Sequence, residues 1–176
     1  MTDLKNKIAL VTGAGSGIGR ATSVALSVKG AKVIVTDRNE DSGNNSVENI
    51  ISNGGKAVFY KLDVSNSSEI ETVIKKIFDI EGSIDLAVNN AGIGGNFDGI
   101  HKLSLKDWNN TININLTGVF CCMQNEIKYM LKNVKCKACF TFYWKWAMRD
   151  SNSRPSTCRV EFTQTINALF WCVLHQ

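Results

Sequence analysis

The sequence predicts an α/β fold, a doubly wound parallel β-sheet with helices on both faces. Three observations carry this prediction. Short apolar runs alternate with amphipathic segments up to residue 132, and a glycine-rich turn joins the first run to the first amphipathic segment. The chain of 176 residues is 44% hydrophobic and 20% charged, which is typical of one globular domain. Strands alternating with helices at this rhythm indicate βαβ units, whose parallel strands are buried on both faces.

The first half of the chain supplies two strands and two helices. Strands are expected at 7–12, "KIALVT", and at 31–37, "AKVIVTD". Between them lies a helix, which Gly30 can end. Its helical spacing predicts an inward face formed by Ile18, Ala21, Ala25 and Val28. A polar helix follows and stops at "NGG", 53–55; its predicted apolar face is Val47, Ile50 and Ile51.

The next segments continue the alternation. Strands are expected at 56–64, "KAVFYKLDV", and at 84–92, "IDLAVNNAG". The helix between them has the apolar stripe Ile70, Val73, Ile74 and Ile77. A long helix is expected from about 107 to 131, with an inward face of Ile112, Leu116, Phe120, Met123, Ile127 and Met130 or Leu131.

The turn "VTGAGSGIGR", 11–20, places four glycines in seven positions. A loop from a strand end to a helix start points backbone N–H groups and the positive end of the helix outward. A pyrophosphate can bind there, provided that no side chain blocks its approach. Glycine-rich turns are also common without any ligand, so a purely structural turn remains the alternative.

Polar residues at three later strand ends support the ligand interpretation, because open α/β sheets bind ligands at the carboxyl ends of their strands. Asp37 follows Gly19 by 18 residues, and its carboxylate can accept both hydroxyls of an adenosine ribose. It would repel a 2′-phosphate, which favours NAD over NADP, although Arg38 weakens that preference. The alternative for Asp37 is a solvated turn residue. Asp63 can meet an adenine amino group, and the amides of "NNAG", 89–92, can line the floor of the site.

Together these motifs resemble the short-chain dehydrogenase/reductase family. The matching segments are "TGAGSGIG" (12–19), "DV" (63–64), "NNAG" (89–92) and "NINLTG" (113–118), in order and at the expected distances. The resemblance covers residues 1–132, the expected nucleotide-binding domain. It implies a Rossmann-type fold, hydride transfer between a nicotinamide cofactor and a secondary alcohol or ketone, and assembly into homodimers or homotetramers.

The resemblance also implies roles for single residues. The pyrophosphate would be held by Gly13, Ser16, Gly17, Ile18 and Gly19. Asp37 would hold the ribose, and Asp63 and Val64 the adenine. Asn90, Ala91 and Gly92 would lie at the inner ribose. Asn115 matches the catalytic asparagine of the family, which helps to organise a proton-relay water.

The family's tyrosine–lysine pair is not found in this sequence. The family moves a proton with a tyrosine whose pKa is lowered by a lysine four residues later. Here the residues four positions after Tyr60, Tyr129 and Tyr143 are valine, asparagine and alanine. The sequence therefore leaves two functions open: an NAD-dependent oxidoreductase, or a truncated and catalytically inactive module that binds a nucleotide or another subunit.

Residues 133–176 depart from the family pattern. Residues 1–132 carry fourteen basic and fourteen acidic side chains, whereas the tail carries the whole net charge of +4 and no glycine. We expect an edge strand within 137–146, exposed coil at 149–159, and a sheet that ends after the fourth or fifth strand. A shifted reading frame, a retained intron or alternative splicing would explain such a tail.

Composition argues against several other functions. No apolar run approaches the roughly 18 residues that a membrane span needs, and the N-terminus has no apolar signal segment, so a cytoplasmic protein is expected. The basic residues of the tail form no nucleic-acid motif. Cys136 and Cys139 form a lone C-x-x-C, with only scattered further ligands, so no metal site is expected.

Overall fold

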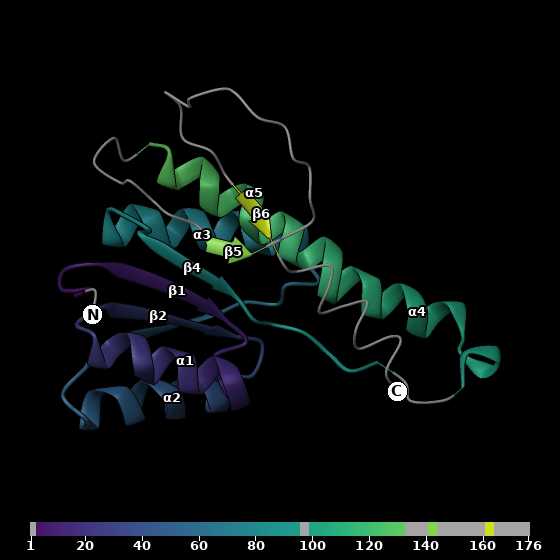
Figure 1. Cartoon of the computed structure of the whole chain (residues 1–176), viewed down its shortest axis with the longest axis horizontal. Helices are drawn as coiled ribbons and strands as arrows, with labels where there is room; N and C mark the ends of the chain where they lie inside the picture. Colours follow the sequence, from purple (N-terminus) through teal and green to yellow (C-terminus); the bar gives the residue numbers. More distant parts are fainter. Residues whose placement is uncertain (1–2, 96–98, 133–140, 144–160, 164–176) are drawn as a thin grey trace. The chain divides into compact units, whose positions relative to one another are not determined.

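The computed structural model describes residues 3–95, 99–132, 141–143 and 161–163. The chain divides into two compact units, Met1–Cys136 and Lys137–Gln176. The first contains a four-stranded parallel sheet in the order β3-β2-β1-β4. Helices α1 and α2 cover one face of this sheet, and α3 and α5 lie over the other (Figure 1). The predicted α/β fold with a parallel sheet is confirmed.

The first unit alternates strands and helices in chain order. The elements are β1 (Ile8–Thr12), α1 (Gly17–Val28), β2 (Lys32–Asp37), α2 (Glu40–Ser52), β3 (Lys56–Lys61), α3 (Ser67–Glu81) and β4 (Leu86–Asn89). They are followed by η1 (Ile100–Lys102), α4 (Leu105–Ile112), the π-helical segment η2 (Asn113–Gly118) and α5 (Val119–Met130). Two strands are shorter than predicted, because β3 ends before Asp63 and β4 ends at Asn89.

The centre of the sheet forms the core. Strands β1 and β2 pair in register from Ile8 opposite Lys32 to Thr12 opposite Thr36. Their fully buried apolar side chains are Ala9, Leu10, Val11, Val33, Ile34 and Val35. Burial of these chains on both faces drives the strands together, and it explains why they form continuous apolar runs in the sequence.

The predicted inward face of α1 is wrong. Ile18 and Val28 are 80% and 74% exposed, and the buried residues are Gly19, Ser23 and Ser27. These small residues let α1 approach the sheet closely. The serine hydroxyls are satisfied within the helix, since they donate to the carbonyl oxygens of Gly19 and Val24. The stripe of small residues at every fourth position was the signal for the true face.

The faces of α2 and α3 are closer to the prediction. In α2, Ile50 is fully buried, but Ile51 is 54% exposed, because the helix turns Gly43 and Ser46 toward the sheet instead. A side chain at Gly43 would collide with the ring of Phe59. In α3 the predicted stripe is confirmed, with Ile70, Ile74 and Ile77 fully buried.

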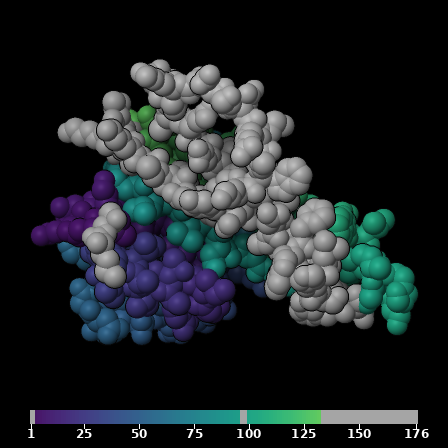
Figure 2. Space-filling model, viewed as in Figure 1, coloured from purple at the N-terminus to yellow at the C-terminus, as the bar shows by residue number. Residues whose placement is uncertain are grey.

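The long helix expected at 107–131 is interrupted by η2. A π-helical segment closes i→i+5 hydrogen bonds and so changes the phase of the side chains along the axis. No single helical stripe survives this change, and Leu116 and Phe120, which were predicted to face inward, are 40% and 56% exposed. Of the predicted alternatives Met130 and Leu131, Met130 is the buried one. Helix α4 contributes no buried residue. It projects beyond the sheet (Figure 1), and Figure 2 shows the η1–α4 region extending from the body formed by α1 and α2.

The second unit contains β5 (Thr141–Tyr143) and β6 (Glu161–Thr163), which pair in parallel. Strand β5 lies within the strand predicted at 137–146. The rest of that stretch, the coil predicted at 149–159 and the C-x-x-C cysteines lie outside the described residues. Within the ranges that the structure describes, no helix has the length and apolar character to span a membrane.

Candidate functional site

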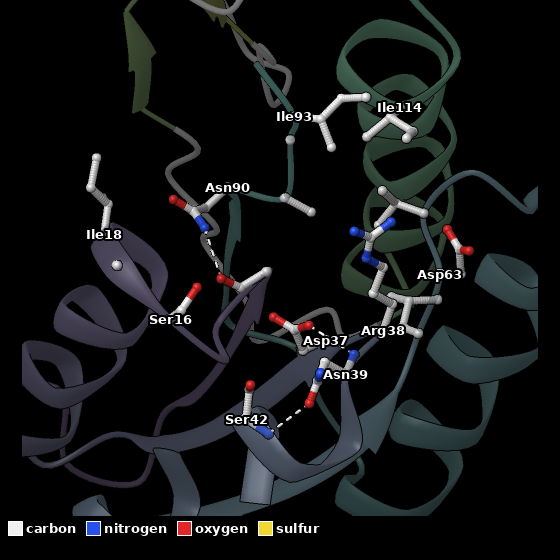
Figure 3. Close-up of a pocket in the computed structure, with 16 residues that line it drawn as sticks. Ser16, Ile18, Asp37, Arg38, Asn39, Ser42, Asp63, Asn90, Ile93 and Ile114 are labelled. Carbon is white, nitrogen blue, oxygen red and sulfur yellow. Dashed lines mark hydrogen bonds between the residues drawn. The ribbon is translucent and has the colours of Figure 1, made fainter. Parts of the chain in front are cut away.

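A cavity of about 620 Å³ lies at the carboxyl ends of β1, β2 and β4 (Figure 3). The structure brings ten of the twelve predicted site residues to its wall: Gly13, Ser16, Gly17, Ile18, Asp37, Asp63, Val64, Asn90, Ala91 and Gly92. Gly19 and Asn115 do not line it. The remaining wall residues were not predicted as site residues: Arg38, Asn39, Ser42, Leu62, Ile93 and Ile114.

The turn between β1 and α1 exposes backbone rather than side chains. Gly13 has a φ of +62° and passes so close to the segment after β4 that a Cβ would lie 2.7 Å from the Ala91 Cα. Gly17 has a φ of +51° and faces open space. Helix α1 starts there, and the first N–H groups of a helix have no intrahelical acceptor. The open turn therefore presents donors to an anion.

Gly19 acts one layer behind this turn. It is buried, and a Cβ at this position would collide with the carbonyl oxygen of Gly13 and lie 2.5 Å from Nδ2 of Asn90. Its lack of a side chain lets α1 pack directly on the start of the turn. Gly19 thus shapes the turn without lining the cavity.

At the end of β2, the Asp37 carboxylate is held by two backbone donors. Gly15 N–H donates to Oδ2 and Asn39 N–H donates to Oδ1, both at 2.9 Å. Asn39 in turn caps α2, because its side-chain oxygen accepts from Ser42 N–H at 2.9 Å. A carboxylate has about four acceptor sites, so Asp37 keeps acceptors for a ligand. Figure 3 shows Arg38 reaching from the end of β2 toward the centre of the cavity.

Arg20 ties the turn to α2. Its Nε donates to the Ser46 hydroxyl at 2.8 Å, and an Nη donates to the carbonyl oxygen of Gly15. The backbone of Gly15 is thus bonded on both sides: its carbonyl oxygen accepts from Arg20, and its N–H donates to Asp37. Arg20 is not among the predicted site residues, and its place directly after the glycine motif is the only signal in the sequence for this role.

Asp63 follows β3 and accepts Ser65 N–H at 2.9 Å. This bond is the main reason why the pKa of Asp63 lies below its usual value. The positive charge of Arg38 also lowers the pKa, whereas partial burial acts to raise it. The backbone N–H of Asp63 donates to the Glu69 carboxylate at 2.9 Å. The Asp63 side chain is therefore an anionic acceptor at neutral pH, and Val64 beside it is 8% exposed.

The end of β4 is fastened to the end of β1. The N–H groups of Asn90 and Ala91 both donate to Thr12 Oγ1, at 3.0 and 3.1 Å. The Asn90 amide also donates to the carbonyl oxygens of Thr12 and Gly13, each at 3.1 Å. Thr12 therefore joins the two strand ends, although it is not among the predicted site residues.

Asn115 lies in the π-helical segment η2, a type of segment that is frequent at functional sites. Its amide accepts from Ile93 N–H at 2.9 Å and donates to the Ile93 carbonyl at 2.8 Å. These bonds hold the loop that follows β4. The catalytic role predicted for Asn115 stays a prediction.

Neither Tyr60 nor Tyr129 lines the cavity. Burial and Glu81 raise the pKa of Tyr60 on β3, with Lys32 opposing them, and Tyr129 is buried with its ring 4.9 Å from that of Phe78. Tyr143 lies on β5 in the second unit. In the described ranges, no group of three His, Cys, Asp or Glu side chains is arranged to hold a metal ion.

A comparison with protein-family models finds that the short chain dehydrogenase model matches residues 7–141. The chain belongs to the short-chain dehydrogenase/reductase family. The four motifs predicted this membership, and the parallel sheet agrees with it.

Relatives within the family have different substrates and cofactors. A 3-oxoacyl-[acyl-carrier-protein] reductase of Synechocystis sp. is 42% identical over 133 residues, which are 75% of this chain and 53% of that protein. The crystal structure of an NAD⁺-bound xylitol dehydrogenase matches with a TM-score of 0.73 and 27% identity, over 75% of this chain and 51% of the other. A metagenomic short-chain oxidoreductase in complex with NADP matches with a TM-score of 0.72 and 29% identity, over 75% and 60%. The chain thus spans about half the length of the relatives that it matches.

Proposed function

We propose that this short-chain dehydrogenase/reductase chain binds NAD in the cavity at the carboxyl ends of β1, β2 and β4. The observation that carries the proposal is the open turn at Gly17, with helix N–H donors on one side and the Asp37 carboxylate on the other. The N–H donors can bind an anion such as the pyrophosphate, and the carboxylate can accept the two hydroxyls of the neighbouring ribose. In this proposal the pyrophosphate lies over residues 13–19, and Asp63, Val64 and 90–92 enclose the adenine and the inner ribose.

Asp37 supports NAD rather than NADP. Its two oxygens are oriented by Gly15 and Asn39, so a 2′-phosphate would approach a fixed negative charge. Arg38 is the only basic residue of the described cavity wall, and it also faces Asp63, whose pKa it lowers. Solved relatives include proteins with NAD and with NADP, so the preference rests on these side chains alone.

The reaction proposed for the lineage is hydride transfer between a secondary alcohol or ketone and the nicotinamide. NAD supplies the hydride acceptor when bound, while Asn90 and Asn115 hold the wall beside it through Thr12 and Ile93. Proton transfer by a positioned side chain contributes about 10²- to 10⁴-fold to a rate. Since this chain has no Tyr-x-x-x-Lys, we propose that it binds the dinucleotide with little or no turnover.

Titration of the full 176-residue chain with NAD and NADP, followed by calorimetry, tests the proposal. We expect saturable binding of NAD, weaker binding of NADP, and a reversal or loss of that preference in Asp37→Ser. Asp41→Ser is a matched control, because Asp41 is an exposed carboxylate on the neighbouring helix α2 and does not line the cavity. A folded chain that takes up neither dinucleotide would disprove the proposal, and robust oxidation of secondary alcohols would disprove the claim of low turnover.

One observation favours a second function, that of a subunit-interaction module. Helix α4 buries no residue, and Leu105 and Trp108 on it are 79% and 41% exposed. Apolar side chains gathered on a projecting helix are typical of a protein–protein contact. Sedimentation velocity of the chain and of Trp108→Lys would test this, and a wild-type monomer at all concentrations would contradict self-association.

A further inference from the structure

The side chains of Glu126 and Asn89 form a buried polar pair behind the cavity wall. Glu126 lies on α5 and is fully buried, and its Oε2 accepts from Asn89 Nδ2 at 2.8 Å. Two further oxygens of the same pair are buried, Glu126 Oε1 and Asn89 Oδ1, and neither has a hydrogen-bond partner among the described residues. Among the described residues, the pair therefore has two buried acceptors that no donor satisfies.

One proton satisfies both acceptors at once. A buried acceptor without a partner destabilises the folded state, and a buried unpaired charge destabilises it more. A protonated carboxyl carries one O–H donor, and a primary amide carries an oxygen acceptor beside its N–H donor. An acid and an amide that already share one N–H···O bond can close a ring by adding an O–H···O bond, which removes the charge and both unsatisfied oxygens.

We propose that Glu126 is protonated in the folded protein and forms a closed acid–amide ring with Asn89, which clamps α5 to the end of β4 and opens when the proton is lost. Glu126 acts on the cavity through Asn89 and the residues that follow Asn89 in the chain. Asn89 directly precedes Asn90 and Ala91, whose bonds to Thr12 form the cavity wall. Glu126 is thus a positioning residue for that wall.

The surroundings of Glu126 support a neutral carboxyl. Burial raises its pKa to about 7, although the bond from Asn89 acts to lower it. On α5, the titratable neighbour is Cys122, one turn earlier, whose own pKa burial and then Glu126 raise. On α3, the charged groups near α5 are Glu71 and Lys75, which pair with Lys128 and Asp79 at the surface. Strand β4 contributes no titratable side chain within Leu86–Asn89.

The sign of the resulting pH dependence follows from the direction of the shift. The unfolded chain releases this proton near pH 4.5 and the folded chain near pH 7, so stability from the ring is complete below pH 4.5 and is lost as the pH rises through 7. From pH 5 to pH 8, the folding equilibrium constant should fall on the order of 50-fold through this group alone.

Urea unfolding of the full chain between pH 5 and pH 8 tests the proposal with the variant Glu126→Gln. Glutamine has the shape of the protonated acid, and its amide can donate to Asn89 Oδ1 while its oxygen accepts from Nδ2. We expect this variant to lose most of the pH dependence and to be more stable than the wild type at pH 8. Glu71→Gln is the matched control, since Glu71 is an exposed glutamate on the facing helix; it should keep the wild-type slope.

Two outcomes would overturn the proposal: an unchanged slope in Glu126→Gln, or a lower stability of that variant at pH 8, which would mean that the carboxylate is charged and paired. If the variant does not fold, infrared spectroscopy of the wild type decides. A band of a protonated carboxylic acid that disappears between pH 6 and pH 8 supports the ring, and its absence at pH 6 rejects it. Neither measurement involves a dinucleotide, so the proposal can fail while the proposed NAD binding stands.

Discussion

The two sides of the cavity fix their polar side chains in different ways. At the end of β2, each oxygen of Asp37 accepts a backbone N–H group, and the half-buried side chain faces the cavity. At the end of β4, the fully buried Glu126 accepts one hydrogen bond from Asn89, and one oxygen of each of these two side chains has no partner among the described residues. The first side has enough donors for its carboxylate, and the second lacks one.

This difference decides what each carboxyl group can do. Asp63, on the same side as Asp37, also accepts a backbone N–H, and its pKa is lowered. A carboxylate supplied with backbone donors remains an acceptor for a ligand at neutral pH. A buried carboxyl without enough donors shifts its pKa upward and responds to pH near neutrality instead. The first arrangement suits recognition and the second suits a structural contact that depends on a proton.

The largest expected effect comes from breaking the junction that joins both sides. In Gly19→Ala, the new Cβ would collide with the Gly13 carbonyl and with Asn90, which are backbone and tightly bonded groups. We expect a loss of about 3 kcal/mol or more in unfolding free energy, because the backbone itself must move. Urea denaturation would measure it.

Gly17→Ala is the matched control for that change. The position has a positive φ but open space around it, so only the strained backbone contributes, about 1–2 kcal/mol. Equal losses in the two variants would contradict the close packing of α1 against the turn. Both variants should bind dinucleotide more weakly than the wild type, if the proposed site is correct.

A double-mutant cycle on the β4 side should give the next largest effect. Asn89→Leu removes the donor to Glu126 and leaves its carboxyl without any bond from the described residues, which should cost about 1–3 kcal/mol at pH 6. Glu126→Leu leaves the Asn89 amide unpaired in the same way. The two changes together should cost less than their sum, because replacing both partners by apolar groups can be nearly neutral.

Unfolding free energies of the four proteins at pH 6 would give the coupling. Strictly additive losses would mean that Asn89 and Glu126 do not depend on each other in the folded state.

Much of the fold could be predicted because it depends on local patterns. The buried strands β1 and β2 appear in the sequence as apolar runs, and the isoleucines of α3 repeat at helical spacing. The face of α1 could not be found in this way, since it packs through Gly19, Ser23 and Ser27, which are not apolar signals. The phase change at η2 likewise depends on backbone bonding that no periodicity reports.

The candidate site divides in the same manner. Its glycines, Asp37, Asp63 and the "NNAG" segment belong to motifs that follow strands, so the sequence alone could bring them to one edge of the sheet. Thr12 and Arg20 contribute through hydrogen bonds to residues far along the chain, Asn90 and Ser46. Glu126 lies in a helix whose pattern in the sequence comes from its apolar residues, and only the three-dimensional contact with Asn89 distinguishes it from a surface glutamate.

The smallest predicted effect concerns how backbone donors fix the Asp37 carboxylate on the β2 side. Asn39→Ala removes the N-cap of α2, whose side chain accepts Ser42 N–H at 2.9 Å, and should cost about 1 kcal/mol in stability. Asn66→Ala removes the equivalent cap of α3, where the distance to Glu69 N is 3.3 Å, and should cost less. Asn39→Asp should retain the cap. Because it adds a negative charge beside Asp37, it should also weaken the binding of NADP more than that of NAD. Equal stability losses at the two caps, measured by urea denaturation, would mean that the shorter bond contributes nothing extra, and that the order around Asp37 comes from its backbone donors alone.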